Sequence, residues 1–303
     1  MRHIQMKILF IGVGKMGLPM SCHLLNQGHD IRVLDPDPIR LQEAAIKGLE
    51  VASQANDSVE DFIWADYIFS SLPNDHAFLE VANQVAQKAA KNTKYIDTST
   101  ISISASAKAA EILENAGVQY LRVAVSGNNH MAAAANLTIL ASGPKPVYDE
   151  ALPLLSSWGS SQFYLGDKEQ ARLMKLVVNL LIAQTSAMLA EGLTLGRLGN
   201  LDWQDMWQVL SASAVGSPIL KAKSAQLGLP LGERDFSPTF TVHQMIKDLQ
   251  LITSAGDDLG ASLAQTKTTL GWMNQAIAQG DGGLDYAAII RVLERQVGIT
   301  DLS

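Results

Sequence analysis

The first forty residues carry a strand–turn–helix–strand pattern that restricts the fold more than any other feature of this sequence. An apolar run at 6–11 leads directly into a glycine-rich turn, and a helix-like stretch at 18–27 follows. A second apolar run, at 31–34, ends in Asp35. The turn reads Gly12-Val13-Gly14-Lys15-Met16-Gly17. Glycines at this spacing between a strand and a helix, with an acid about 20 residues further on, predict a dinucleotide-binding unit.

Each glycine of the turn has a physical task. Gly12 permits a tight turn, Gly14 lets the backbone approach a pyrophosphate, and Gly17 lets the helix pack closely on the strand. The N-terminus of the helix offers unpaired N–H groups to the phosphates. We therefore expect the whole turn, residues 12–17, to bind the cofactor.

Asp35 indicates which dinucleotide binds. A carboxylate at the end of the second strand can accept hydrogen bonds from both ribose hydroxyls, and it repels a 2′-phosphate. The next three residues are Pro-Asp-Pro, so no arginine directly follows to bind that phosphate. The sequence therefore favours NAD over NADP, and Arg32 and Arg40 are the residues that could reverse this preference.

Composition narrows the classes of protein and partner. The 303 residues suffice for two domains, and a net charge of −7 argues against nucleic acid or an anionic membrane surface as the main partner. No uninterrupted apolar stretch of about 18 residues and no signal-peptide core are visible, so we expect neither a membrane span nor secretion. The single cysteine, Cys22, fits a reducing compartment, and we expect a cytoplasmic protein. The six histidines lack metal-ligand spacing, which predicts no metal site.

The organisation of the chain changes near Gly166. Before it, short apolar runs alternate with helical stretches, which predicts an α/β domain at 1–167 with a mainly parallel sheet covered on both faces. After it, no strand alternation is visible, and apolar residues recur at helical spacing from Lys168 to about Arg197. We therefore expect an all-α domain at 168–303 that opens with one long helix.

The predicted long helix is apolar nearly all round. Such a helix must be buried on several sides. A subunit interface would bury it, so we expect a homodimer or homotetramer, with burial inside a single chain as the alternative.

Ligands of open parallel sheets bind outside the carboxyl ends of the strands. The first segment expected there contains Leu72 and Pro73, a rigid turn whose backbone could face the nicotinamide-side ribose. The second, at 97–100, is a run of hydroxyls that could hold a ribose or a substrate carboxylate, or could cap the next helix. The third offers a hydroxyl and exposed N–H groups suited to an anion, or forms an ordinary polar turn: Ser126, Gly127 and Asn128.

Lys175 and Asn179 are the candidate catalytic pair. They stand four residues apart in the long helix and therefore share one face of it. A lysine in a cleft that excludes water can take a proton from an alcohol, and Asn179 would orient the lysine or the hydroxyl. The simpler interpretation of Lys175 alone is a surface lysine whose stem covers apolar groups. Lys247 and Asp248 form a further pair, in which the lysine could close over the cofactor or make an exposed helix ion pair.

The chain resembles the β-hydroxyacid dehydrogenase family over nearly its whole length. The resemblance lies in GVGKMGLPM at 12–20, SLP at 71–73, DTST at 97–100, VSG at 125–127, GDKEQARLMKLVVN at 166–179 and FTVHQMIKDL at 240–249. It implies a Rossmann domain followed by an all-α domain that is built on a long interdomain helix.

The same resemblance implies roles for individual residues. Lys175 would be the catalytic acid and base, with Asn179 beside it. The substrate carboxylate would bind to Ser126 and Gly127. The remaining residues would contact the cofactor or help to shape the site: Thr100, Lys247 and Asp248.

The loop after Gly127 departs from the family pattern. Family members usually continue Ser-Gly-Gly, whereas this chain has an amide at Asn128, followed by Asn129, His130 and Met131. Asn128 could donate a hydrogen bond to the acid group or to a second polar substituent of the substrate. It could equally adopt the left-handed conformation and fill the turn without contact.

These observations predict reversible NAD-dependent oxidation of a small β-hydroxy acid or a related anionic alcohol. An imine reductase or reductive aminase on the same fold is the first alternative, although those relatives commonly lack a lysine at position 175. A cofactor-binding sensor without catalysis is the second, since the altered loop at 128–131 could mark a lost activity.

Overall fold

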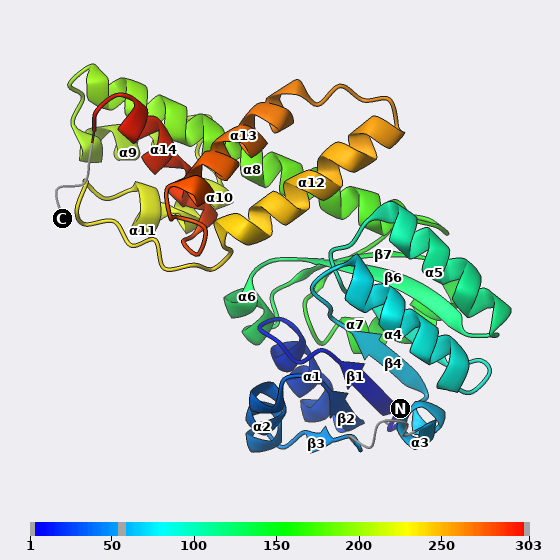
Figure 1. Cartoon of the computed structure of the whole chain (residues 1–303). Helices are drawn as coiled ribbons and strands as arrows, with labels where there is room; N and C mark the ends of the chain where they lie inside the picture. The colour runs from blue at the N-terminus through cyan, green and yellow to red at the C-terminus, as the bar shows by residue number, and fades with distance from the viewer. Residues whose placement is uncertain (1–3, 54–58, 300–303) are drawn as a thin grey trace. The chain divides into compact units, whose positions relative to one another are not determined.

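The computed structural model describes residues 4–53 and 59–299, and the chain divides into two compact units, residues 1–175 and 176–303. The first unit alternates strands and helices (Figure 1). Its strands are β1 (Lys7–Ile11), β2 (Asp30–Leu34), β3 (Glu50–Val51), β4 (Tyr67–Ser70), β5 (Lys94–Asp97), β6 (Gln119–Ser126), β7 (Thr138–Ser142) and β8 (Ser161–Tyr164). Its helices are α1 (Gly17–Asn26), α2 (Pro38–Ile46), α3 (Val59–Trp64), α4 (Asp75–Lys88), α5 (Ile103–Asn115), α6 (Asn129–Ala133) and α7 (Lys145–Leu155).

The strands form one sheet in the order β3-β2-β1-β4-β5-β6-β7-β8. Neighbouring strands are parallel, except that β6 and β7 are antiparallel. The expected doubly wound, mainly parallel α/β architecture is therefore confirmed. Two short elements, β3 and α6, were not predicted, because two and five residues are too few to show a hydrophobic period.

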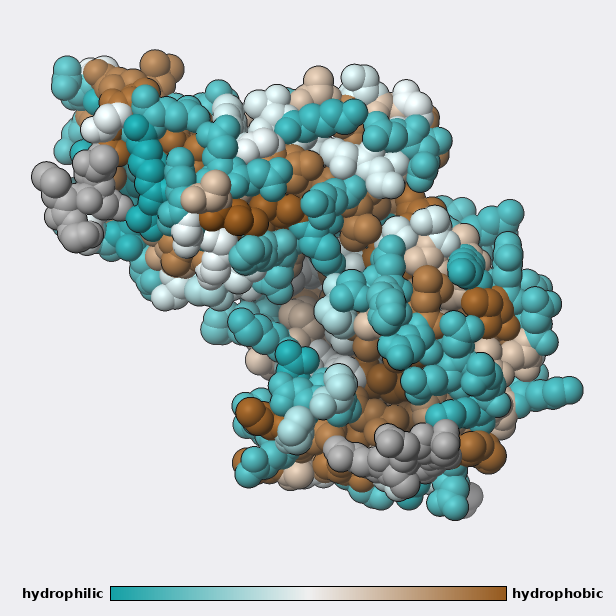
Figure 2. All heavy atoms as spheres, in the orientation of Figure 1, coloured by the Kyte–Doolittle hydropathy of each residue, from teal (hydrophilic) through white to brown (hydrophobic). Residues whose placement is uncertain are grey.

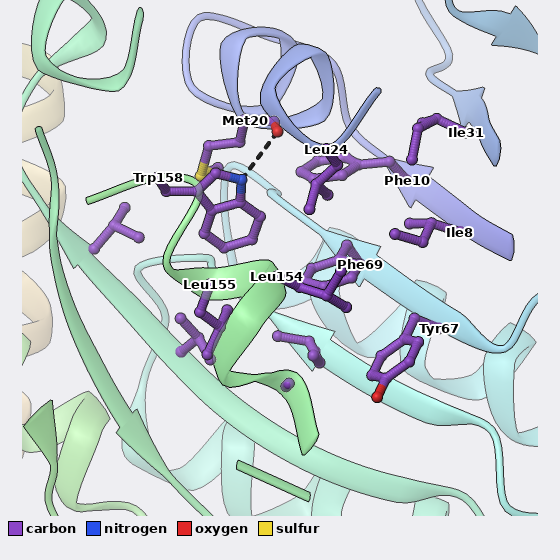
Figure 3. Close-up of a cluster of buried hydrophobic side chains, with 14 of the residues drawn as sticks. Ile8, Phe10, Met20, Leu24, Ile31, Tyr67, Phe69, Leu154, Leu155 and Trp158 are labelled. Atoms are coloured by element: carbon purple, nitrogen blue, oxygen red, sulfur yellow. Dashed lines mark hydrogen bonds between the residues drawn. The ribbon is translucent and has the colours of Figure 1, made fainter. Parts of the chain in front are cut away.

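Alternation along β1 explains why both faces of the sheet are covered. Ile8 belongs to one buried apolar cluster and Leu9 to a second, because successive side chains of a strand point to opposite faces. In the first cluster, Trp158 packs edge-on against Phe69 with ring centres 5.4 Å apart, and its indole N–H donates to the Met20 carbonyl at 2.9 Å (Figure 3). This contact holds α1, the helix after the glycine turn, against the segment that follows α7.

The pairing register aligns the carboxyl ends of four neighbouring parallel strands. Ile11 lies opposite both Leu34 and Ser70, and Ser70 lies opposite Asp97. The segments that follow these residues therefore leave the sheet at one edge. Strand β6 continues from position 122, opposite Asp97, to Ser126, so it carries Ser126 about 13 Å beyond that edge.

The regular elements among the described residues of the second unit are all helices, apart from one isolated bridge between Thr241 and Asp285. The long helix α8 (Gln170–Leu198) begins in the first unit and continues into the second. The helices that follow are α9 (Trp203–Ala212), α10 (Pro218–Ala222), α11 (Ser224–Leu227), α12 (Val242–Asp258), α13 (Ala264–Ala278), the 3₁₀ helix η1 (Tyr286–Ala288) and α14 (Ile289–Gln296). The all-α character expected after the sheet is confirmed.

Helix α8 leaves several apolar side chains exposed, and brown side chains reach the surface of the helical unit in Figure 2. By length and composition α8 is also apolar enough to cross a membrane, and within the described residues it is the one helix that is. A single helix of this kind is weak evidence for a membrane span, because the core helix of a soluble protein has the same length and composition.

Candidate cofactor and substrate site

The glycine turn has the close packing that the sequence pattern requires. Gly12 has a φ of +90°, and a Cβ there would lie 2.3 Å from the Ser71 carbonyl oxygen. A Cβ on Gly17 would lie 1.9 Å from the Gly12 carbonyl oxygen. Gly14 is different, because a Cβ there would meet only the Arg40 guanidinium, at 3.4 Å. The side of Gly14 that lacks a Cβ therefore meets only the end of a flexible side chain, which fits close approach of a pyrophosphate. Lys15 and Met16 complete the turn, exposed and half-buried respectively.

Asp35 is fixed by backbone N–H groups of two segments. One carboxylate oxygen accepts from the Val13 N–H at 2.9 Å, and the other accepts from the Asp37 N–H at 2.9 Å. The residue is buried, yet each carboxylate oxygen can accept further hydrogen bonds. The carboxylate is thus held beside the glycine turn with acceptor capacity left for ribose hydroxyls, and the residues fit a dinucleotide.

Arg32 and Arg40 differ in how available they are to bind a 2′-phosphate. Arg32 is engaged by Glu50 at 3.1 Å and Asp61 at 2.8 Å, and it lies over the Trp64 ring. Arg40 is half-exposed and has one guanidinium nitrogen 3.6 Å from the Asp35 carboxylate. Arg40 is therefore the cation positioned at the ribose end of the predicted cofactor site, and its charge is already balanced in part by Asp35.

The first and second predicted strand-end segments, 72–73 and 97–100, are joined by a hydrogen bond. The Leu72 N–H donates to the Ser99 hydroxyl at 2.8 Å, and Ser99 in turn donates to the Asp97 carboxylate at 2.6 Å. Pro73 follows as an exposed residue, and Thr100 is half-buried. Helix α5 is capped by Ser102, which lies outside this run and whose side chain accepts from the Ala105 N–H. Ser99 was not singled out from the sequence, since only its place among hydroxyls marked it.

The loop after β6 settles the conformation of Asn128. Gly127 has a φ of +140°, where a Cβ would lie 2.6 Å from Leu137. Asn128 has a φ of −110° and caps α6, because its side-chain oxygen accepts from the Met131 N–H at 3.0 Å. The left-handed alternative for Asn128 is therefore wrong. The capping bond uses the side-chain oxygen and leaves the amide N–H groups as the donors that a ligand could meet. Ser126, just before this loop, is half-buried.

In the second unit, Asn179 and Asp248 form one buried pair. The Asn179 side-chain amide donates to the Asp248 carboxylate at 2.5 Å, and both residues are more than nine-tenths buried. The Lys247 ammonium lies 3.2 Å from the other Asp248 oxygen. One N–H of the Asn179 amide is engaged by the carboxylate, so its carbonyl oxygen and its second N–H are the groups that a ligand could meet. Lys175 stands one turn before Asn179 on the same face of α8 and is half-buried.

The predicted site residues thus gather in two places. Within the first unit, the glycine turn, Asp35, the Leu72–Pro73 turn and Thr100 follow the aligned strand ends, and Ser126 to Asn128 lie beyond them on β6. Within the second unit, Asn179, Lys247 and Asp248 are neighbours. Within the described part of the chain, no cluster of three or more metal-binding side chains is present.

Known protein families match the chain in two successive parts. Residues 7–166 match the family described as NAD binding domain of 6-phosphogluconate dehydrogenase. Residues 170–293 match the family described as NAD-binding of NADP-dependent 3-hydroxyisobutyrate dehydrogenase.

Similar proteins extend this likeness to nearly the full length. A 2-(hydroxymethyl)glutarate dehydrogenase from Eubacterium barkeri is 30% identical over 97% of this chain and 97% of its own. The solved structure of the 3-hydroxyisobutyrate dehydrogenase of Mycobacterium tuberculosis with L-serine has a TM-score of 0.86 at 27% identity, covering 96% of this chain and 99% of that one. An imine reductase from Pseudomonas sp. is similar in fold alone, with a TM-score of 0.62 at 18% identity over 96% of this chain and 100% of that one. From its dinucleotide turn, its sheet and these matches, the chain belongs to the β-hydroxyacid dehydrogenase family of NAD(P)-dependent oxidoreductases.

Proposed function

We propose that the protein catalyses reversible oxidation of a small β-hydroxy acid with NAD, and that Lys175 is the general acid and base. The observation that carries this proposal is the combination of a complete dinucleotide turn with Lys175 and Asn179 on one face of α8. Asn179 is oriented by the buried Asp248 carboxylate. In this proposal residues 1–167 are the dinucleotide-binding domain, and residues 168–303 are the substrate and oligomerisation domain.

The reaction requires a hydride acceptor, which NAD supplies when bound. The amine of Lys175 takes the hydroxyl proton during oxidation and returns it to the alkoxide oxygen during reduction. The carbonyl oxygen of Asn179 accepts a hydrogen bond from the lysine or from the substrate hydroxyl, and the bond from its amide nitrogen to Asp248 fixes the orientation of the amide. The protein thus contributes orientation and proton transfer.

The substrate carboxylate would bind at the end of β6. Ser126 offers a hydroxyl there, and the backbone N–H groups that follow it are suited to an anion. The amide N–H groups of Asn128 can reach a second polar substituent, because its side-chain oxygen is already used to cap α6. The relative from Eubacterium barkeri is named for a substrate with two carboxylates, which supports a second acid group as a substrate feature.

The experiment that tests this function is a turnover screen of β-hydroxy acids, including dicarboxylic, sulfonate and phosphonate analogues, with NAD and NADP in parallel. Turnover of at least one hydroxy acid is expected, with NAD preferred. Activity on a cyclic imine with none on any hydroxy acid would favour the imine reductase alternative, which Lys175 argues against. Tight NADH binding without any turnover would identify a sensor instead.

The preference for NAD rests on Asp35, and its removal is expected to reverse the preference. In Asp35→Ser, the ribose hydroxyls lose a charged acceptor and Arg40 loses the carboxylate that lies 3.6 Å away. The Kd for NADH should rise about tenfold to a hundredfold, because a hydrogen bond to a charged group contributes about 1.5–3 kcal/mol. The Kd for NADPH should fall, since the repulsion is gone and Arg40 is released. Fluorescence titration with both cofactors measures the two constants.

Asp37→Ser is the matched control for this substitution. Asp37 also lies beside Arg40, at 3.5 Å, and it caps α2 by accepting from the Ile39 N–H. Serine keeps a capping oxygen, so α2 should remain intact and the ratio of the two cofactor affinities should change less than threefold. An unchanged ratio in Asp35→Ser would contradict the assignment of NAD.

The exposed stripe of α8 leads us to propose a homodimer or homotetramer. Four exposed apolar residues stand seven positions apart and therefore fall on one face of the helix: Met174, Leu181, Met188 and Leu195. A seven-residue spacing suits packing against another helix, and a second copy of this chain offers the same stripe. Within this proposal the protein is cytoplasmic, in keeping with its single free cysteine.

A charge placed in the stripe is expected to dissociate this assembly. Leu181→Glu should shift the mass measured by light scattering from a multiple of 32.6 kDa towards 32.6 kDa, because an unpaired carboxylate would be buried at the contact. Leu259→Glu serves as the control, since Leu259 is equally exposed but follows α12. If light scattering gave a mass of 32.6 kDa for the wild-type protein, or the same mass for Leu181→Glu as for the wild type, the role of this stripe would be refuted.

A further inference from the structure

A buried arginine at the start of α8 has no part in the mechanism proposed above. Arg172 lies in the first turn of the helix, and its side chain is 1% exposed. It faces Asp97 at the end of β5, which is fully buried. The guanidinium Nη2 donates to the Asp97 carboxylate at 2.5 Å. An ion pair this deeply buried is costly to desolvate, so it requires further hydrogen bonds to be maintained.

Those further hydrogen bonds come from three other segments of the first unit. Arg172 donates to the Ser99 carbonyl at 2.7 Å and to the Tyr120 hydroxyl at 2.9 Å. Its Nε lies 3.4 Å from the Ser106 hydroxyl on α5. Burial acts to lower the pKa of Arg172, but Tyr120 and Asp97 outweigh it and raise the pKa, so the guanidinium stays charged. The rigid fork of Arg172 therefore joins the start of α8 to β5, β6 and α5.

The same network extends to the cofactor side of the site. Asp97 accepts from the Ser70 hydroxyl and from the Ser99 hydroxyl, each at 2.6 Å. Ser99 then accepts from the Leu72 N–H at 2.8 Å. One buried cluster thus fixes both the Leu72 turn and the backbone that leads into Thr100.

We propose that Arg172 is a positioning residue for the reaction: it locks the first turn of α8, and with it Lys175, to the strand ends that carry the cofactor-binding turn. Lys175 stands three residues after Arg172, about 4.5 Å further along the helix axis and turned by about 60°. Rotation of α8 about its own axis would move the Lys175 amine, and the Arg172 fork opposes that rotation. This inference rests on the proposed role of Lys175.

Other contacts at the start of α8 lack the link to the cofactor side. The Ser142 hydroxyl accepts from the Ala171 N–H at 3.0 Å, and Arg122 pairs with Glu169 just before the helix. These contacts reach β7 and β6. Arg172 instead contacts the 97–99 segment. Substitution of Arg172 should therefore displace both the Lys175 amine and the Leu72 turn.

The test compares Arg172→Met and Arg172→Lys with Arg234→Met as a matched control. Arg234 also makes a buried ion pair, with Glu294 at 3.0 Å, but it lies in the helical unit far along the sequence from the proposed catalytic residues. The measurements are kcat and KM for the best hydroxy acid per mole of folded protein, the primary deuterium isotope effect on kcat, and the Kd for NADH by fluorescence.

In Arg172→Met, kcat should fall about a hundredfold, as expected when reacting groups are displaced by about 1 Å. The isotope effect on kcat should rise, because hydride transfer becomes the slow step, and the Kd for NADH should rise about tenfold. Arg172→Lys should recover part of kcat, since an ammonium keeps the charge but lacks the fork. Arg234→Met should lose stability while its kcat per folded molecule and its isotope effect remain those of the wild type.

The inference is overturned if both Arg172 variants match Arg234→Met in kcat, isotope effect and NADH affinity, because that is the behaviour of a purely structural ion pair. If the Met variant does not fold, the Lys variant decides by the same measurements. Failure of the proposed function is distinct, since the wild type would then turn over no hydroxy acid. The Kd for NADH would still show whether Arg172 holds the cofactor turn, and an unchanged Kd in that case would reject the inference.

Discussion

Lys175→Ala is expected to reduce kcat by about a thousandfold while leaving the Kd for NADH within threefold of the wild-type value. A positioned general acid and base contributes about a hundredfold to ten-thousandfold, and this substitution leaves unchanged the glycine turn and Asp35, the residues proposed to bind the cofactor. Steady-state kinetics with the best substrate of the screen and fluorescence titration with NADH give the two numbers.

Lys175→Arg tests, in the same experiment, whether activity requires proton transfer by the side chain at position 175 or only its positive charge. An arginine keeps the positive charge but does not release its proton in this pH range, so kcat should stay as low as in the alanine variant. Lys267→Ala, at an exposed ion pair on α13, is the control and should keep full activity. If Lys175→Ala retained more than a tenth of kcat, another group would have to carry the proton.

Gly17→Ala is expected to destabilise the first unit and to abolish cofactor binding together. The new Cβ would lie 1.9 Å from the Gly12 carbonyl oxygen and 3.0 Å from its carbon. Both atoms are backbone of the cofactor turn, so the turn itself must move. Overpacking of this kind costs about 3 kcal/mol, equivalent to a fall of about 10 °C in the thermal midpoint. Calorimetry and NADH titration on the same preparation measure both effects.

Gly14→Ala provides the contrast within the same turn. Its Cβ would meet only the flexible Arg40 side chain, at 3.4 Å, so the thermal midpoint should change by less than about 2 °C. The Kd for NADH should nevertheless rise at least about tenfold, because the methyl group occupies the side from which a pyrophosphate approaches. If Gly14→Ala lost as much stability as Gly17→Ala, Gly14 would be required for packing, and its assigned role in ligand approach would be contradicted.

Local patterns predicted the architecture well, because each depends on a short stretch of chain. The alternation of strands and helices, the glycine turn and the long helix α8 were all visible as periodicity or spacing within about thirty residues. Elements too short to show a period, β3 and α6, were missed. The conformation of Asn128 was open for the same reason, since it depends on whether a five-residue helix begins at the next residue.

The burial of Arg172 could not be predicted from local patterns. An arginine in the first turn of a helix is usually exposed, and nothing in its neighbours along the sequence indicates burial. Its partner Asp97 is 75 residues away and belongs to a motif interpreted for its hydroxyls. The asparagine of the candidate catalytic pair is likewise oriented by Asp248, 69 residues away.

Short segments of the amino-acid sequence specify a dinucleotide-binding α/β domain followed by helices, and they place the residue types that the proposed chemistry requires. Strand, turn, helix and acid lie within thirty residues, so short-range sterics and hydrophobic period specify them. Long-range packing specifies which side chains hold those residues in place: Ser99 on the Leu72 amide, Arg172 on Asp97, and Asp248 on Asn179. These contacts depend on how strands register and helices pack across long stretches of chain, and no spacing in the sequence encodes that register.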